Sequence, residues 1–171
     1  IIQVSQVAFY RPRRGTLDMP VIVRLTTRIS HARGFVALGD QVENFEKDYE
    51  KQPAKYIMMP GYARGRKVDL LKRIEAAKKL SDSTELNRIE AGDGKVGVIC
   101  SGVCYQYVKE ALPHASILKL GMVYPLPEQK IRDFAASVEK LYVVEELEPY
   151  IQRYVESLGI ECIGDQVFGK A

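Results

Sequence analysis

From Lys95 onward, short runs of apolar residues alternate with segments in which apolar residues recur every three or four positions. The short runs are bounded by turn residues and are too brief for helices, which is typical of buried strands. They predict strands at Val96–Cys100, Ile117–Leu120, Leu141–Val144 and Ile160–Ile163.

Helical periodicity links these predicted strands. Pro113 is expected to end the first helix and Gly159 the third, while Pro149 lies in a first turn, where its missing N–H costs nothing. The apolar stripes are Cys104, Val108 and Ala111; then Ile131, Phe134, Ala135 and Val138; then Ile151, Tyr154, Val155 and Leu158.

Three strand–helix units that end in a strand predict a largely parallel sheet, because parallel neighbours need a crossover connection. Right-handed crossovers lay helices on both faces, so the predicted fold is an open, mostly parallel α/β domain. In such sheets ligands gather at the carboxyl ends of the strands. Here that edge carries Ser101-Gly102, Gly121–Tyr124 and Glu145-Glu146.

The N-terminal half is less regular. Residues 21–25 form a strand-like run that leads into a segment ending at His31. Residues 40–67 are mixed and polar, with two prolines and two glycines that interrupt any period, so we predict an extended arm there. One amphipathic helix is expected within residues 68–80. The predicted divisions of the chain are 1–34, 35–92 and 93–171.

Composition bounds the class of protein. The 171 residues are 46% hydrophobic and 27% charged, which suits a chain that buries a core and excludes disorder and collagen-like repeats. No apolar run approaches the roughly 18 residues that a membrane span needs. Three cysteines argue against a secreted disulfide framework. The chain opens on Ile1 without a signal peptide, which indicates a piece of a longer protein.

Charge is distributed unevenly. Residues 1–90 hold 17 Lys/Arg against 11 Asp/Glu, a balance of +6, whereas residues 91–171 hold 8 against 11, a balance of −3. Solvated surface charge explains the basic half best. Docking of an acidic neighbour stays open, and nucleic acid is disfavoured because no binding motif accompanies the charge.

Two motifs with possible cofactor chemistry have simpler explanations. Gly92-Asp93-Gly94 matches the start of a thiamine diphosphate fingerprint, but the asparagine that should follow it is absent, so a turn is favoured. Cys100 and Cys104 fall on a strand and on the buried stripe of a helix, which indicates packing thiols, with a redox pair or a metal site as alternatives.

Other polar residues are candidates for contacts. His31 follows Arg28 and Ser30 in a loop, where a structural or interdomain contact is favoured over catalysis. The carboxylates from Glu145 to Glu148 precede a helix, and we expect them to complement its positive end, with cation binding as the alternative. Ser101-Gly102 opens a helix directly after a strand, which favours ordinary capping or docking over anion binding.

Several blocks of the sequence resemble the alpha subunit of indolepyruvate ferredoxin oxidoreductases. The resemblance runs in order from about residue 19 to 169. It is carried by Pro20–His31, Tyr56–Pro60, Leu86–Glu90, Ser101–Lys109, Leu118–Pro127 and Tyr142–Pro149. The chain departs from the family pattern at residues 1–18, and at Tyr62 and Gly65, where histidine-like and basic residues are expected.

The resemblance implies a cytoplasmic enzyme that oxidatively decarboxylates arylpyruvates to aryl-acetyl-CoA. It would use thiamine diphosphate, Mg²⁺ and [4Fe-4S] clusters, with ferredoxin, coenzyme A and a beta subunit as partners. Residues 1–34 would end a pyrimidine-binding-type domain, 35–92 would be a linker arm, and 93–171 would be a transketolase C-terminal-like domain.

The resemblance implies that the cofactor sites lie elsewhere in the subunit, so we expect no catalytic, cofactor-binding or metal-binding residue here. Possible domain-junction contacts are Arg28, Ser30, His31, Ser101 and Gly102. The expected role is structural and interdomain, without nucleic acid or membrane. The alternatives are a stand-alone module that binds an acidic partner or nucleic acid through the basic half, and a small redox protein using Cys100 and Cys104.

Overall fold

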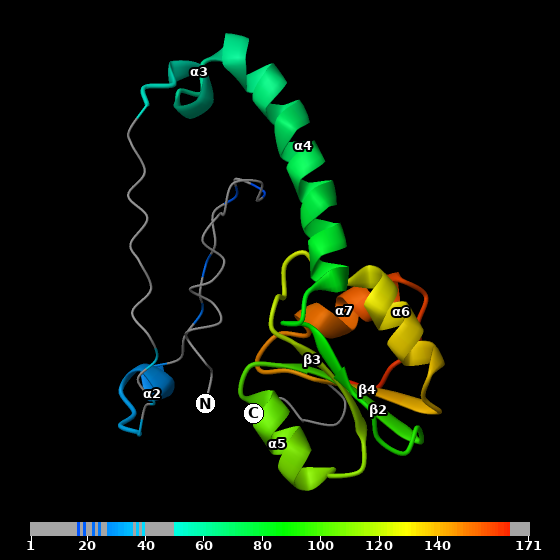
Figure 1. The fold of residues 1–171 in the computed structure, drawn as a ribbon. Helices are drawn as coiled ribbons and strands as arrows, with labels where there is room; N and C mark the ends of the chain where they lie inside the picture. The colour runs from blue at the N-terminus through cyan, green and yellow to red at the C-terminus, as the bar shows by residue number, and fades with distance from the viewer. Residues whose placement is uncertain are drawn as a thin grey trace. The chain divides into compact units, whose positions relative to one another are not determined.

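A computed structural model describes residues 17, 19, 22, 24, 27–35, 37, 39 and 50–164 (Figure 1). The chain divides into two compact units, residues 1–73 and 74–171. The predictions for residues 1–16 and 40–49, and most of the strand-like run at 21–25, lie outside the described residues. The domain boundaries expected at residues 34 and 92 stay predictions.

The first unit contains more helix than the sequence predicted. Thr27–Ser30 (α2) is one helical turn where a loop was expected, and Pro53–Tyr56 (α3) is another turn. Helix α4, Pro60–Ser83, begins in this unit and ends in the second. The prediction that residues 53–67 are extended is therefore wrong for most of that segment.

Helix α4 starts at a proline because the first helical position needs no N–H donor. Gly61 and Gly65 cost about 1 kcal/mol each relative to alanine, but the arginine, lysine, leucine and alanine residues that follow are strong helix formers. The helix predicted within 68–80 is thus confirmed and is longer at both ends. None of the described helices is both long and apolar enough to cross a membrane.

The second unit is built on a four-stranded sheet with the order β1-β3-β2-β4. Its elements in chain order are β1 (Arg88–Glu90), β2 (Val96–Ser101), α5 (Cys104–Ala111), β3 (Ser116–Leu120), α6 (Glu128–Ala136), β4 (Lys140–Val144) and α7 (Tyr150–Ser157). Strands β2, β3 and β4 are parallel, and β1 runs antiparallel to β3. The predicted open, mostly parallel sheet is confirmed.

The sheet buries apolar side chains on both faces. In β2, Val98 and Cys100 point toward α5, whereas Ile99 points to the opposite face. Figure 1 shows α5 on one side of the sheet and α6 with α7 on the other. Phe134 from α6 and Val155 from α7 complete the larger core. Helices on both faces were predicted, and the alternation along each strand explains them.

Three details of the predicted unit are wrong. Ile160–Ile163 forms only a single bridge, from Ile163 to Tyr142, within the described residues. Ala111 is exposed, and Tyr105 replaces it as a buried residue of α5. Val138 lies beyond the end of α6, although it packs against the core.

Replacing Gly102 by valine should lower the free energy of unfolding by about 1–3 kcal/mol. Gly102 has φ +57°, a region that β-branched residues avoid, and its missing side chain would otherwise meet open space. Gly102→Asn should cost clearly less, because asparagine tolerates this region. Urea denaturation of the two variants checks this, and equal losses would contradict the backbone explanation.

Candidate functional site

The strand ends that the sequence predicted at one edge of the sheet do lie at the same edge. Ser101 on β2 is in register with Leu120 on β3, and Cys100 on β2 is in register with Val144 on β4. The carboxyl ends of the three parallel strands therefore lie together. This is the edge at which sheets of this class bind ligands.

At the end of β4, the Glu145 carboxylate caps α7. Its Oε2 accepts a hydrogen bond from the Ile151 N–H at 2.9 Å, and its Oε1 accepts one from the Gln152 N–H at 3.0 Å. Both oxygens thus satisfy free donors at the positive end of the helix. The prediction that these carboxylates complement a helix N-terminus is confirmed for Glu145.

At the end of β3, the side chain of Asn87 holds the turn. Its Oδ1 accepts hydrogen bonds from the Gly121 N–H at 3.0 Å and the Met122 N–H at 2.8 Å. Its Nδ2 donates to the carbonyl of Ser81 at 3.0 Å and to Ser81 Oγ at 3.1 Å. Asn87 is fully buried, so its whole bonding capacity is used inside the protein.

Neighbouring contacts extend this network. Ser81 Oγ donates to the Pro125 carbonyl at 2.6 Å, and the Lys130 ammonium donates to the Asn87 carbonyl at 2.5 Å. A Cβ at Gly121 would lie 2.6 Å from the carbonyl oxygen of Leu86, so this position requires glycine. The network joins the end of α4 to the turn after β3.

At the end of β2, Ser101 and Gly102 form the turn into α5. Gly102 supplies the left-handed residue, and Val103, the N-cap residue of α5, makes no side-chain cap. Ser101 and Gly102 thus lie at the same edge as Glu145 and Gly121. The contacts predicted for them with other domains stay predictions.

The remaining predicted junction residues lie in the first unit. Arg28 and Ser30 belong to α2, and the His31 N–H donates to the Thr27 carbonyl at 3.0 Å. Ser30 and His31 are exposed. Their interdomain role likewise stays a prediction.

The cysteines are core residues, as predicted. Cys100 is fully buried and Cys104 is nearly so. Burial, together with the nearby Cys104, raises the pKa of Cys100 to about 12, and burial raises the pKa of Cys104 as well. Burial also raises the pKa of Cys162 to about 11. These thiols are therefore poorly ionised at neutral pH.

The Gly92-Asp93-Gly94 motif is a turn, as predicted. Asp93 Oδ1 accepts a hydrogen bond from the Lys95 N–H at 3.0 Å, and the Asp93 N–H donates to the His114 carbonyl at 3.0 Å. An aspartate that bonds the backbone two residues ahead is typical of tight turns. The side chain thereby serves the entry into β2.

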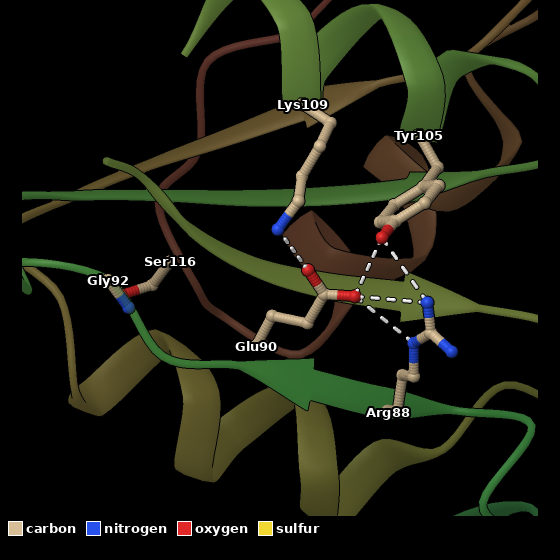
Figure 2. A network of polar contacts seen from close by, with 6 residues as sticks. All are labelled: Arg88, Glu90, Gly92, Tyr105, Lys109 and Ser116. Atoms are coloured by element: carbon tan, nitrogen blue, oxygen red, sulfur yellow. Dashed lines mark hydrogen bonds and ion pairs between the residues drawn. The ribbon is translucent and has the colours of Figure 1, made fainter. Parts of the chain in front are cut away.

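A network of charged and polar side chains joins β1 to α5 (Figure 2). Glu90 Oε1 accepts hydrogen bonds from the Tyr105 hydroxyl at 2.7 Å and from Arg88 Nε at 3.1 Å. Glu90 Oε2 accepts from the Lys109 ammonium at 2.6 Å. The Lys119 ammonium lies 4.6 Å from the centre of the Tyr105 ring. Edge strand β1 is thus held in place in two ways. Its backbone pairs with β3, and its side chains bind to α5.

This network sets the charge of Glu90. Burial opposes ionisation of the carboxyl, but the hydrogen bonds from Lys109 and Tyr105 outweigh it, and the pKa of Glu90 is lowered. Burial and repulsion from the nearby Arg88 lower the pKa of Lys119 as well. The lowered pKa of Glu90 favours its ionised form, and the cluster links elements that are distant in sequence.

A groove of about 400 Å³ lies beside the carboxyl edge. Its lining includes three tyrosines and both charge signs: Tyr124, Tyr150, Tyr154, Asp82, Glu128 and Lys78. Tyr150 is held by a hydrogen bond from its hydroxyl to the Val123 carbonyl at 3.3 Å. The sequence predicted Gly121–Tyr124 at this edge but not the groove, because its walls come from three separate segments.

Replacing Asn87 by alanine should lower the free energy of unfolding by about 3 kcal/mol. The change leaves the Met122 N–H without its acceptor, leaves the Gly121 N–H with only the Leu86 carbonyl, and removes both donors to Ser81. Gln106→Ala, on the exposed side of α5, is the matched control and should change stability by less than about 0.5 kcal/mol. Urea denaturation measures both, and equal losses would contradict this role of Asn87.

Glu90 should make stability depend on acid. Its pKa is lowered in the folded protein, so the stabilisation is present above the unfolded value of about 4.3 and is lost as pH falls through the folded value. Between about pH 5 and pH 3, wild type should lose more stability than Glu90→Gln. Glu110→Gln, at an exposed position of α5, should behave as wild type in the same urea titrations.

Comparison with known proteins places these features in context. No family model matches the chain. Among solved structures, 2-oxoglutarate:ferredoxin oxidoreductase from Magnetococcus marinus aligns with 63% of this chain and 20% of its own, at 16% sequence identity and a TM-score of 0.46.

Curated relatives share the sequence much more closely. The indolepyruvate oxidoreductase subunit IorA of Archaeoglobus fulgidus is 37% identical over 158 residues, which is 89% of this chain and 25% of that subunit. The IorA subunits of Methanothermobacter thermautotrophicus and Pyrococcus abyssi are 35% and 36% identical over 80% of the chain. The chain spans about a quarter of the length of these relatives. Over that quarter, it belongs to the family of the indolepyruvate oxidoreductase subunit IorA.

Proposed function

We propose that this chain is a structural, interdomain segment of an indolepyruvate:ferredoxin oxidoreductase alpha subunit. The whole subunit would oxidatively decarboxylate arylpyruvates to aryl-acetyl-CoA and pass the electrons to ferredoxin. The observation that carries the proposal is the 37% identity to an indolepyruvate oxidoreductase subunit over 89% of the chain.

The contacts at the carboxyl edge support a structural role. Both oxygens of Glu145 cap α7, and the Asn87 amide holds the turn after β3. Ser81 is committed to Asn87 and to the Pro125 carbonyl. The polar atoms of these three side chains are therefore engaged in hydrogen bonds that stabilise the fold.

The described residues do not fit the cofactors that the family implies. Asp93 bonds its own turn, whereas a magnesium ligand would need its carboxylate directed at the ion. Cys100 and Cys104 are packed inside the hydrophobic core between β2 and α5, whereas cluster ligands must face the cluster. Among the described residues, no three potential ligands group around a common point.

In the proposed enzyme, the other parts of the subunit would hold thiamine diphosphate, Mg²⁺ and the [4Fe-4S] clusters. The partners of this segment would be those parts and the beta subunit, and the enzyme would act in the cytoplasm with ferredoxin and coenzyme A. Arg28, Ser30, His31, Ser101 and Gly102 would contribute to the domain junctions.

The isolated chain should not bind thiamine diphosphate in the presence of Mg²⁺, because Asp93 has no downstream asparagine to complete the site. Isothermal titration calorimetry is expected to show no heat of binding. Magnesium-dependent binding that Asp93→Ala abolishes would contradict the structural assignment and place the cofactor in this segment.

The enzymatic proposal is tested on the whole subunit with its partner subunit. Indolepyruvate and coenzyme A should reduce ferredoxin, and Glu145→Gln should lower the melting temperature without changing the KM for indolepyruvate. A cofactor-loaded complex that oxidises no arylpyruvate would refute the function. A loss of kcat at unchanged melting temperature would refute the structural role of Glu145.

A further inference from the structure

Two cations face each other across the pair of strands β1 and β3. Arg88 on β1 and Lys119 on β3 are register partners in antiparallel strands. Such partners point to the same face of the sheet with Cβ atoms about 5 Å apart, and like charges there destabilise the pair. The guanidinium carbon of Arg88 lies 5.5 Å from the centre of the Tyr105 ring, and Lys119 Nζ lies 4.6 Å from it. Two positive charges therefore lie around one aromatic ring.

The carboxylate beside these cations is already shared. Glu90 is the one carboxylate among the described residues whose charge acts on Lys119. Its Oε2 accepts a hydrogen bond from the Lys109 ammonium, and its Oε1 accepts hydrogen bonds from Tyr105 and Arg88 (Figure 2). The ion pairs of Glu90 are with Arg88 and Lys109, and Lys119 is left out. Three cations thus share one carboxylate, which leaves an excess of two positive charges.

This excess charge is accessible to a ligand. The Arg88 side chain is 50% exposed, and Lys119 is only partly buried. Burial and the charge of Arg88 lower the pKa of Lys119, as expected for a cation without a counter-ion. Natural sequences break a local rule of this kind mainly at functional sites, where a gain elsewhere compensates the cost. The missing component is therefore an anion.

We propose that Arg88 and Lys119 bind the phosphate group of a small phosphate monoester beside the Tyr105 ring. Such a group carries roughly −1.5 to −2 charges at neutral pH and three acceptor oxygens, which matches the excess charge. Arg88 Nε donates to Glu90 and Arg88 Nη2 donates to Tyr105, so Nη1 and the three donors of Lys119 are the groups that would bind the phosphate. A carboxylate would neutralise only half of the excess. This site goes beyond the proposed structural role and does not depend on the enzymatic function.

Isothermal titration calorimetry of the full chain with inorganic phosphate, at low ionic strength, tests the site. Phosphate should bind the wild type, and Lys119→Met should weaken binding roughly tenfold or more, because it keeps the length of the side chain but not its charge. Lys140→Met, at an exposed position of β4, is the matched control and should leave the affinity unchanged. Acetate, a monoanion, should bind the wild type roughly tenfold more weakly than phosphate.

Thermal unfolding gives an independent readout. Because Lys119 faces Arg88, Lys119→Met should raise the melting temperature at low ionic strength without phosphate, whereas Lys140→Met should not. Added phosphate should raise the melting temperature of the wild type but not that of Lys119→Met. A wild type that does not bind phosphate, or a Lys119→Met chain that binds it equally well, would overturn the proposal. So would a Lys119→Met chain that melts below the wild type, or acetate that binds as tightly as phosphate.

Discussion

The amide of Asn87 is the contact on which the second unit depends. A buried amide without partners would cost several kcal/mol, so the segments that supply its four hydrogen bonds are held in one arrangement. Those segments are the end of α4 and the turn after β3. Because Asn87 directly precedes β1, the same contact starts the antiparallel edge strand. It also fixes the turn that leads to Tyr124 and therefore one wall of the groove.

The pattern of apolar residues predicted the parallel sheet. Its strands are buried on both faces and therefore appear as apolar runs, whereas its helices are buried on one face and appear as apolar stripes. It missed β1, because Arg88–Glu90 is too short to show a period and Ile89 is half exposed. It also took Pro60, Gly61 and Gly65 as interruptions. In the structure a proline begins α4, and strong helix formers offset the cost of two glycines.

The candidate edge was predictable to a similar degree. Glu145 was expected at a helix N-terminus because carboxylates before a helix satisfy its free donors, and buried thiols were expected from the stripes that contain them. Asn87 carried no such signal, since its role comes from burial among segments 34 residues apart. The groove lined by Tyr124, Tyr150 and Tyr154 was not predicted, for the same reason. The pattern of apolar residues along the sequence predicts single helices and strands. The Asn87 contacts and the groove are each formed by several segments together, so no local pattern predicts them.

The network around Tyr105 gives β1 a particular kind of constraint. The strand has three residues, and its attachment to α5 relies on Glu90 being shared between Tyr105 and two cations. Loss of Glu90 would leave Arg88 and Lys109 without their common partner beside the buried Tyr105. Because Arg88 and Lys109 are half exposed, each ion pair stabilises the fold little by itself. Natural selection over evolutionary time would therefore act most strongly on Glu90, the residue that the other three share.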